Sequence, residues 1–329
     1  MLSLLAFFAI SHAQTATIKI DGSSTVYPIT EAVAEEFQTS KRGKVKITVG
    51  VSGTGGGFKK FCRGETDIQD ASRPIQKATK AGETGEMETC AKAGIRFFEI
   101  PIAFDATVII VNKANTFLNQ ITVAELKKMW EPAAEGKVKT WKDVNPAWPA
   151  QPLKLYGAGA DSGTFDYFTE AVVGKAKLSR GDYTPSEDDN VLVKGVSSDK
   201  NALGYLPFSY YEANKASLKV IPVIGKGGKP IIPARDSVEN GTYEPLSRPL
   251  FIYVSEKSYA RAEIKEFVEF YLTKAPALVV DAKYVPLPEA AYKLGLDHVK
   301  AGKLGTVFAG HSEVGMKIED LMKKEKKLQ

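Results

Sequence analysis

Three short segments of the chain place serine, threonine and glycine directly before the start of an expected helix. They are residues 23–26 (Ser-Ser-Thr-Val), 52–57 (Ser-Gly-Thr-Gly-Gly-Gly) and 162–164 (Ser-Gly-Thr). The first amide groups of a helix lack internal partners, and the helix dipole is positive at that end. Glycine lets the backbone approach a ligand and hydroxyl groups add donors, so each segment is a candidate anion site.

Taken singly, these segments are weak indications, because serine and threonine cap helices whether or not an anion binds. Three of them in one chain could converge from different helices on one tetrahedral oxyanion. Neutral donors would then replace the water around the anion without supplying an equal counter-charge, which keeps release possible. The pattern therefore favours a binding site for an oxyanion.

A fourth segment, residues 71–74 (Ala-Ser-Arg-Pro), adds a cation. The guanidinium of Arg73 can hold two oxygens of an oxyanion in a fork. The alternative is an exposed arginine that merely precedes a turn. We include Arg73 and its neighbour Ser72 among the candidate binding residues.

Two catalytic interpretations of the same segments are disfavoured. Residues 53–57 lack the Gly-Lys-Ser/Thr ending of a phosphate-binding P-loop. A hydrolase using Ser162 would need a general base, but the histidines are His12, His298 and His311, the first in an expected leader and the others expected at the surface. No metal-ligand cluster is evident either, so we expect no catalysis and no cofactor.

The elements that must position these segments alternate between strand and helix. Residues 18–20 and 45–51 alternate as strands do, whereas Ile29, Val33 and Phe37 follow Pro28 at helical spacing. We further expect a helix from Phe58, strands at 154–156 and 250–254, helices at 165–172 and 264–271, and an aromatic-packed loop at 130–152. This alternating order predicts an α/β fold. Because no obvious linker separates two halves of the sequence, either one domain interrupts the other or both form one large unit.

Composition is that of a globular protein with room for two domains. The chain has 329 residues, of which 43% are hydrophobic and 25% charged, with a net charge of +5. Lysine and arginine are spread evenly, which does not favour nucleic-acid binding. The exception is a C-terminal lysine run, which we interpret as a solvated tail, at Lys323, Lys324, Lys326 and Lys327.

The N-terminus and the cysteines both indicate export. Residues 1–10 are apolar and Ser-His-Ala follows, which predicts a signal peptide (residues 1–13) cleaved after Ala13; a buried strand is the alternative. No cysteine follows that site, so no lipid anchor is expected. Cys62 and Cys90 are the only cysteines, and an even pair in an exported protein predicts a disulfide rather than two free thiols.

In combination, these segments resemble the periplasmic phosphate-binding proteins of the bacterial Pst phosphate ABC transporter. The resemblance runs from about residue 18 to 254 and is carried, in order, by residues 22–28, 52–57, 71–74, 161–168, 186–190 and 204–205. It implies a two-domain binding protein (type II, Venus-flytrap) whose domains close around phosphate. Two strands near 101–112 and 247–254 would form the hinge, giving domain 1 at 14–110 plus 250–329 and domain 2 at 111–249.

The resemblance also assigns the binding residues. Domain 1 would contribute the hydroxyls of Ser24 and Thr25, the amide of Val26, Ser52 and, with less support, Thr54. Domain 2 would contribute Ser162, Gly163 and Thr164. The partners implied are inorganic phosphate and a membrane permease, and the protein would act as a monomer.

The chain departs from the family pattern in two places. Many relatives carry an aspartate where this chain has Arg73, and an arginine where it has Gly159. Arg73 would then supply the missing guanidinium, and another carboxylate would accept the phosphate proton: Asp161 first, with Asp70 and Asp105 as rivals. That acceptor would repel sulfate, which carries no proton at neutral pH. Without it, the chain would bind another oxyanion, such as sulfate or molybdate; a secreted hydrolase using Ser162 is the remaining alternative.

Overall fold

The computed structural model describes residues 15–78 and 82–328, so the expected signal peptide lies outside the described residues. Strands and helices alternate along the first part of the chain, as expected for an α/β fold. They are β1 (Ala16–Gly22), α1 (Tyr27–Ser40), β2 (Val45–Val51), α2 (Gly53–Phe61), β3 (Ile68–Ala71), α3 (Glu86–Lys92) and β4 (Phe97–Asn112).

The middle part of the chain continues the alternation with shorter elements. They are β5 (Ile121–Thr122), α4 (Val123–Trp130), the 3-10 helix η1 (Pro132–Ala134), α5 (Trp141–Val144), β6 (Lys154–Ala158), α6 (Gly163–Val173), β7 (Thr184–Ser186), α7 (Asp189–Ser198), β8 (Ala202–Pro207), α8 (Phe208–Asn214), β9 (Leu218–Ile221), β10 (Val223–Ile224), β11 (Pro230–Ile231) and α9 (Arg235–Glu239). The last part is mostly helical, with β12 (Ser247–Ser255), α10 (Glu256–Tyr259), α11 (Ala262–Asp281), β13 (Val285–Pro286), α12 (Glu289–Lys300) and α13 (Ile318–Glu325).

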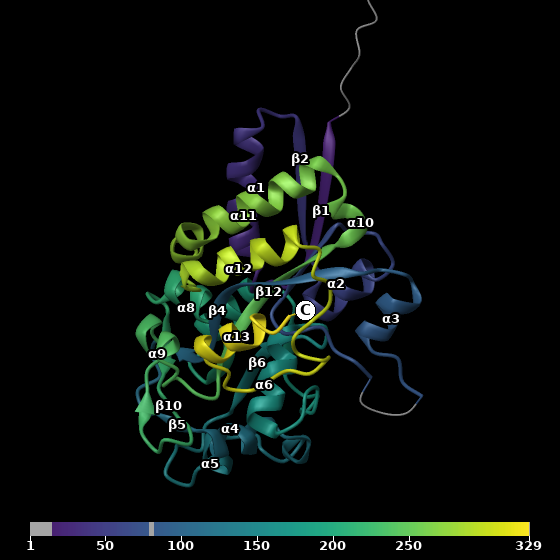
Figure 1. Ribbon diagram of the computed structural model, residues 1–329. Helices are drawn as coiled ribbons and strands as arrows, with labels where there is room; N and C mark the ends of the chain where they lie inside the picture. The colour runs from purple at the N-terminus through teal and green to yellow at the C-terminus, as the bar shows by residue number, and fades with distance from the viewer. Residues whose placement is uncertain (1–14, 79–81, 329) are drawn as a thin grey trace, which may run out of the picture.

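One long mixed sheet runs through the molecule in the strand order β2-β1-β3-β12-β4-β8-β6-β7. The pairs among β1, β2 and β3 are parallel, as are those that β6 makes with β7 and β8, whereas β12 and β4 are antiparallel to each other. In Figure 1, α1 and α11 lie at one end of the molecule and α4 and α5 at the other, with β4 and β12 between them.

Strand β4 links the two ends of this sheet because its pairing partner changes along its length. Its first part, Phe97–Ala106, pairs with β12, and its second part pairs with β8 from Thr107 and with β9 from Ile109. Both β4 and β12 are buried almost throughout, and most of their residues are apolar, although buried charged side chains interrupt each strand. We call the sheet and helices on the β1–β3 side the first half, and those on the β6–β8 side the second half.

The glycine-rich segment at 52–57 is helical, which corrects the expectation that a helix starts only at Phe58. Helix α2 begins at Gly53. Gly53 has φ +75°, and a Cβ there would lie 2.6 Å from the carbonyl oxygen of Asp161 in the second half. Glycine is therefore required here for backbone conformation and for close approach, although glycine weakens a helix elsewhere.

Two other expectations need revision. The 130–152 region is not only loop, because it contains α5, and its Trp141 is completely buried against Phe117 and Trp148. The C-terminal lysines are not a free tail, because part of the run lies on α13, which is anchored by buried Leu321. An amphipathic helix can bury one side while its lysines stay exposed, and a charge run alone does not reveal that side.

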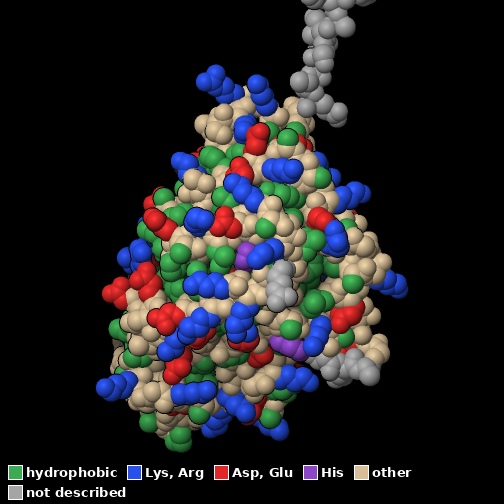
Figure 2. Space-filling model, viewed as in Figure 1, with side chains coloured by type: hydrophobic (Ala, Val, Ile, Leu, Met, Phe, Trp, Pro, Cys, Tyr) green, Lys and Arg blue, Asp and Glu red, His purple; other side chains and the backbone are tan. Residues whose placement is uncertain are grey.

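The surface carries both signs of charge. On the face seen in Figure 2, lysine and arginine side chains are interspersed with aspartate and glutamate. Within the described ranges, the helices are all too short or too polar to span a membrane.

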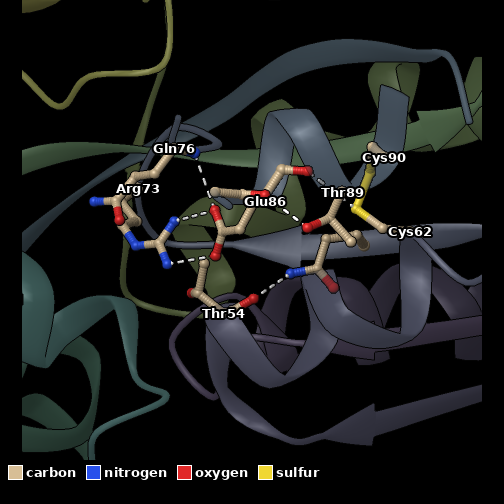
Figure 3. The surroundings of a disulfide bond; sticks show 9 residues. Thr54, Cys62, Arg73, Gln76, Glu86, Thr89 and Cys90 are labelled. Atoms are coloured by element: carbon tan, nitrogen blue, oxygen red, sulfur yellow. Dashed lines mark hydrogen bonds and ion pairs between the residues drawn. A yellow bond between two sulfur atoms is a disulfide. The ribbon is translucent and has the colours of Figure 1, made fainter. Parts of the chain in front are cut away.

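The predicted disulfide is confirmed. Cys62, at the end of α2, is bonded to Cys90 of α3, and both residues are buried. The bond connects the segment that carries α3 to the end of α2 in the first half (Figure 3).

We expect loss of this bond to destabilise the protein through its unfolded state. The bond joins residues 28 positions apart, and closing a loop of that length is worth about 3–4 kcal/mol of unfolding free energy. Chemical denaturation of the Cys62→Ser/Cys90→Ser double variant should show this loss, and reductant should affect only the wild type. A wild-type stability that reductant leaves unchanged would contradict the prediction.

Candidate functional site

The first predicted turn leads from β1 into α1. Its Thr25 is completely buried, and the Thr25 hydroxyl lies 3.1 Å from that of Thr164 in the second half. The Ser24 hydroxyl donates to Asp189 Oδ2 at 2.8 Å, again across the two halves. The Val26 amide donates to the Ser23 carbonyl within the turn. Two hydroxyls of this turn therefore face the second half.

The second predicted turn lies at the start of α2. Thr54 is completely buried, and its hydroxyl lies 3.1 Å from the hydroxyl of Ser72 and accepts the Ser72 amide at 3.2 Å. The Ser52 hydroxyl instead donates to Asp21, whose carboxylate pairs with Lys60 at 2.6 Å. Thr54 and Ser72 thus form one cluster, while the Ser52 hydroxyl is hydrogen-bonded to the neighbouring Asp21–Lys60 ion pair.

The third predicted turn opens α6. Ser162 caps this helix by accepting the Thr164 amide at 3.1 Å. A Cβ on Gly163 would lie 2.4 Å from the Ser72 hydroxyl and 2.6 Å from that of Thr54. Only glycine fits between these two hydroxyls, so the α6 turn packs directly on the cluster from the first half.

Arg248, which the sequence reasoning missed, joins these turns. It lies on β12 with its side chain 1% exposed. Its Nη1 donates to the Gly163 carbonyl at 2.7 Å and its Nη2 to the Thr164 hydroxyl at 2.7 Å. Nη2 also lies 3.4 Å from the Thr25 hydroxyl. One guanidinium therefore contacts the turns of both halves.

Among the described residues, Asp105 is the one carboxylate that pairs with Arg248. Asp105 stands opposite it in the β4–β12 register, and its Oδ2 lies 3.3 Å from Nη2. Burial raises the pKa of Asp105 from 3.8 to about 6, although the guanidinium acts in the opposite direction. The Nε of Arg248 has no hydrogen-bond partner among the described residues. An arginine within an otherwise apolar strand was the available signal for this site.

A second buried carboxylate adjoins the first turn. Asp189, in the first turn of α7, has a pKa raised from 3.8 to about 7, chiefly by burial and partly by the charge of Asp105. The Ser24 hydroxyl bond acts against that rise. Asp189 belongs to the 186–190 segment that carried the family resemblance, but no pattern within that segment predicts a role for its carboxylate.

The other two candidate acceptors lie elsewhere. Asp161 is 42% exposed and pairs with Lys59 at 2.8 Å. Asp70 is completely buried and accepts the Thr30 hydroxyl at 3.0 Å. Its pKa is raised well above 3.8 by burial. Within the described residues, neither Asp161 nor Asp70 contacts Arg248.

Arg73 does not share in the Arg248 cluster. Its guanidinium is buried between two carboxylates, with Nε 2.6 Å from Asp166 and Nη2 2.7 Å from Glu86. Its charge is thus already compensated by protein groups.

The geometry does not assemble a catalytic triad or a metal centre in the part of the chain that is described. Among these residues no group of three His, Cys, Asp or Glu side chains could hold a metal ion. His298 is buried against Glu325, 3.8 Å away, so the expectation that it lies at the surface is wrong; His311 is exposed, as expected. The side chain of His298 is buried. The residue type alone could not predict this burial.

Comparison with known proteins agrees with this arrangement. The PBP superfamily domain matches residues 9–275. The chain is 52% identical to Protein SphX of Synechococcus elongatus, over 95% of this chain and 90% of that protein. It is 38% identical to the phosphate-binding protein PstS of Staphylococcus saprophyticus, over 84% and 82% of the two chains.

Solved structures give the same picture. A possible phosphate-binding protein from Planctomyces limnophilus is 44% identical, with a TM-score of 0.63 over 87% of this chain and 98% of that one. A putative phosphate ABC transporter substrate-binding protein from Clostridium perfringens, solved with phosphate, is 26% identical, with a TM-score of 0.66 over 83% and 100%. The chain has the mixed α/β, two-domain fold of these proteins, and it belongs to the PstS family of phosphate-binding proteins within the PBP superfamily.

Proposed function

We propose that this protein binds inorganic phosphate between its two halves and delivers it to the membrane permease of an ABC transporter, without catalysing a reaction. The observation that carries the proposal is the buried guanidinium of Arg248, which contacts the Gly163 carbonyl and the Thr164 and Thr25 hydroxyls. The Nε of Arg248 is a buried donor that lacks a partner within the described chain, which is costly, and a phosphate oxygen would supply an acceptor. The names of the relatives support phosphate as the anion.

The binding set follows from the same geometry. Hydroxyls of the α1 and α6 turns would donate to phosphate from opposite halves, and Arg248 would supply the charge that the sequence reasoning assigned to Arg73. The Thr54 and Ser72 hydroxyls lie against Gly163 and would be the remaining phosphate ligands from the first half. Ser162 would act through its turn, because its hydroxyl caps α6.

Closure would occur about β4 and β12. The pairing partner of β4 changes between Ala106 and Thr107, and the first residue of β12, Ser247, pairs with Ala106. The two points at which the chain passes between the halves therefore lie close together. This supports domains at 14–110 plus 250–329 and at 111–249, with the boundaries still predictions. A monomer that closes in this way would present a permease with a surface that exists only in the loaded state. Export through the predicted leader is part of the same proposal.

We assign the proton acceptor to Asp105 in place of Asp161. Asp105 is buried beside Arg248, and its Oδ1 receives no side-chain hydrogen bond from the residues that the structure describes. An ionised carboxylate can accept the proton of hydrogen phosphate but repels sulfate, which has none to offer. The assignment therefore explains how a site built largely from neutral donors could distinguish the two anions.

Arg248 should be essential for phosphate binding. In calorimetric titration of phosphate-stripped protein, the wild type should bind one phosphate, and Arg248→Met should lose on the order of a hundredfold in affinity, the worth of its charged hydrogen bonds. Arg261→Met is the matched control, because Arg261 bonds Asp67 and the Thr17 carbonyl instead. A variant at Arg248 that binds phosphate as the wild type does would refute the proposed site, and a wild type that binds no phosphate would refute the function.

Selectivity should depend on pH through Asp105. Because its pKa is raised to about 6, Asp105 is ionised at neutral pH and becomes protonated as the pH falls below about 6. It then donates a hydrogen bond, so sulfate should begin to compete with phosphate at pH 5 but not at pH 8.

The substitution Asp105→Asn should abolish this pH dependence and admit sulfate at pH 8. Asp161→Asn, which disturbs a half-exposed carboxylate paired with Lys59, is the control and should stay selective. Competition titrations with sulfate at both pH values measure the effect. Full discrimination by Asp105→Asn at pH 8 would show that another group accepts the proton.

A further inference from the structure

Arg73 forms a buried charge cluster of its own, apart from Arg248. It follows β3, and its side chain is 1% exposed. Glu86 contacts the guanidinium through both carboxylate oxygens, at 2.8 Å to Nη1 and 2.7 Å to Nη2, and Asp166 contacts Nε at 2.6 Å. Figure 3 shows Glu86 facing the guanidinium, with the disulfide beyond it.

The two carboxylates come from different halves of the molecule. Glu86 lies on α3, which the Cys62–Cys90 bond attaches to α2, and it also accepts the Gln76 amide at 3.0 Å. The Arg73–Glu86 pair therefore belongs to the first half whether the protein is open or closed. Asp166 lies on α6, the helix whose first turn holds Gly163 and Thr164.

Asp166 depends on Arg73 while the halves are in contact. Its side chain is 2% exposed, and its second oxygen, Oδ1, has no hydrogen-bond partner among the described residues. Burial raises the pKa of Asp166, and the charge of Glu86 acts in the same direction. A carboxylate buried in this way is stabilised chiefly by its guanidinium partner, which only closure can provide.

We propose that Asp166 is a positioning residue for phosphate: its ion pair with Arg73 forms when the two halves close, holds the α6 turn on the site and slows phosphate release. This inference rests on the proposed function. Asp166 itself need not touch phosphate, because its effect passes through α6 to Gly163 and Thr164.

The alternative, that Arg73 is itself a phosphate ligand, predicts an effect of opposite sign. If Arg73 bound phosphate, removing the charge of Asp166 would free the guanidinium and strengthen binding. If Arg73 and Asp166 act as a latch, removing that charge weakens the closed state. The direction of the change thus separates the two roles.

The test is the dissociation rate of radiolabelled inorganic phosphate from the full chain, diluted into excess unlabelled phosphate. Asp166→Asn should release phosphate about tenfold faster, as expected for the loss of one charge-assisted hydrogen bond. Its discrimination against sulfate should equal that of the wild type, which a damaged binding site would not preserve. Asp182→Asn is the matched control, because it removes a carboxylate from buried Arg180 entirely within the second half, and its release rate should be unchanged.

Glu86→Gln provides a second variant with the opposite expectation. In the open state, the substitution leaves Arg73 without a carboxylate partner. In the closed state, it removes the repulsion between Glu86 and Asp166. Both effects favour the closed state, so phosphate should dissociate more slowly than from the wild type. Unchanged or slower release from Asp166→Asn, or equal acceleration in both variants, would overturn the proposal. Failure of the wild type to bind phosphate would instead refute the proposed function.

Discussion

The arrangement of this protein depends on a guanidinium buried where two halves of a sheet meet. Arg248 lies on β12, and the carboxylate that pairs with it within the described part of the chain, Asp105, stands opposite it on β4. A buried charge is costly unless its donors find acceptors, and most acceptors of the two Nη groups of Arg248 are neutral groups of the α1 and α6 turns. The contacts that stabilise the arginine are therefore the same contacts that bring the halves together.

The buried carboxylates around the site differ in their charged partners, and we propose different roles for them accordingly. Asp105 and Asp189 are buried beside the Arg248 cluster, and burial raises the pKa of each towards neutrality. The pair of Arg73 and Asp166 is separate and compensates charge across the two halves without drawing on Arg248. A second ion pair between the halves would allow the phosphate release rate to change without altering the charge that Arg248 offers to phosphate.

The sequence predicted the parts of the site that follow from local rules. The hydroxyl and glycine turns before helices, the strand at 250–254 and the paired cysteines all have signatures within a few residues. The pairing of Arg248 with Asp105 has no such signature, because it depends on strand register between segments 143 positions apart, and Asp105 was predicted only as a rival acceptor. The partners of Arg73 were equally hidden, since Asp166 reaches it from the other half and Glu86 from the disulfide-bound α3. A charged residue in a mostly apolar strand was a usable sign of Arg248 that the sequence predictions did not include, and it would not have given the partner of Arg248.

The most direct test of the central claim is a crystal structure of the full chain with inorganic phosphate. The account predicts the anion between the two halves, with an oxygen within hydrogen-bond distance of the Arg248 guanidinium and others at the Thr25 and Thr164 hydroxyls. Arg73 should remain paired with Glu86 and Asp166. Phosphate bound to Arg73, with Arg248 still satisfied by protein groups alone, would contradict the account.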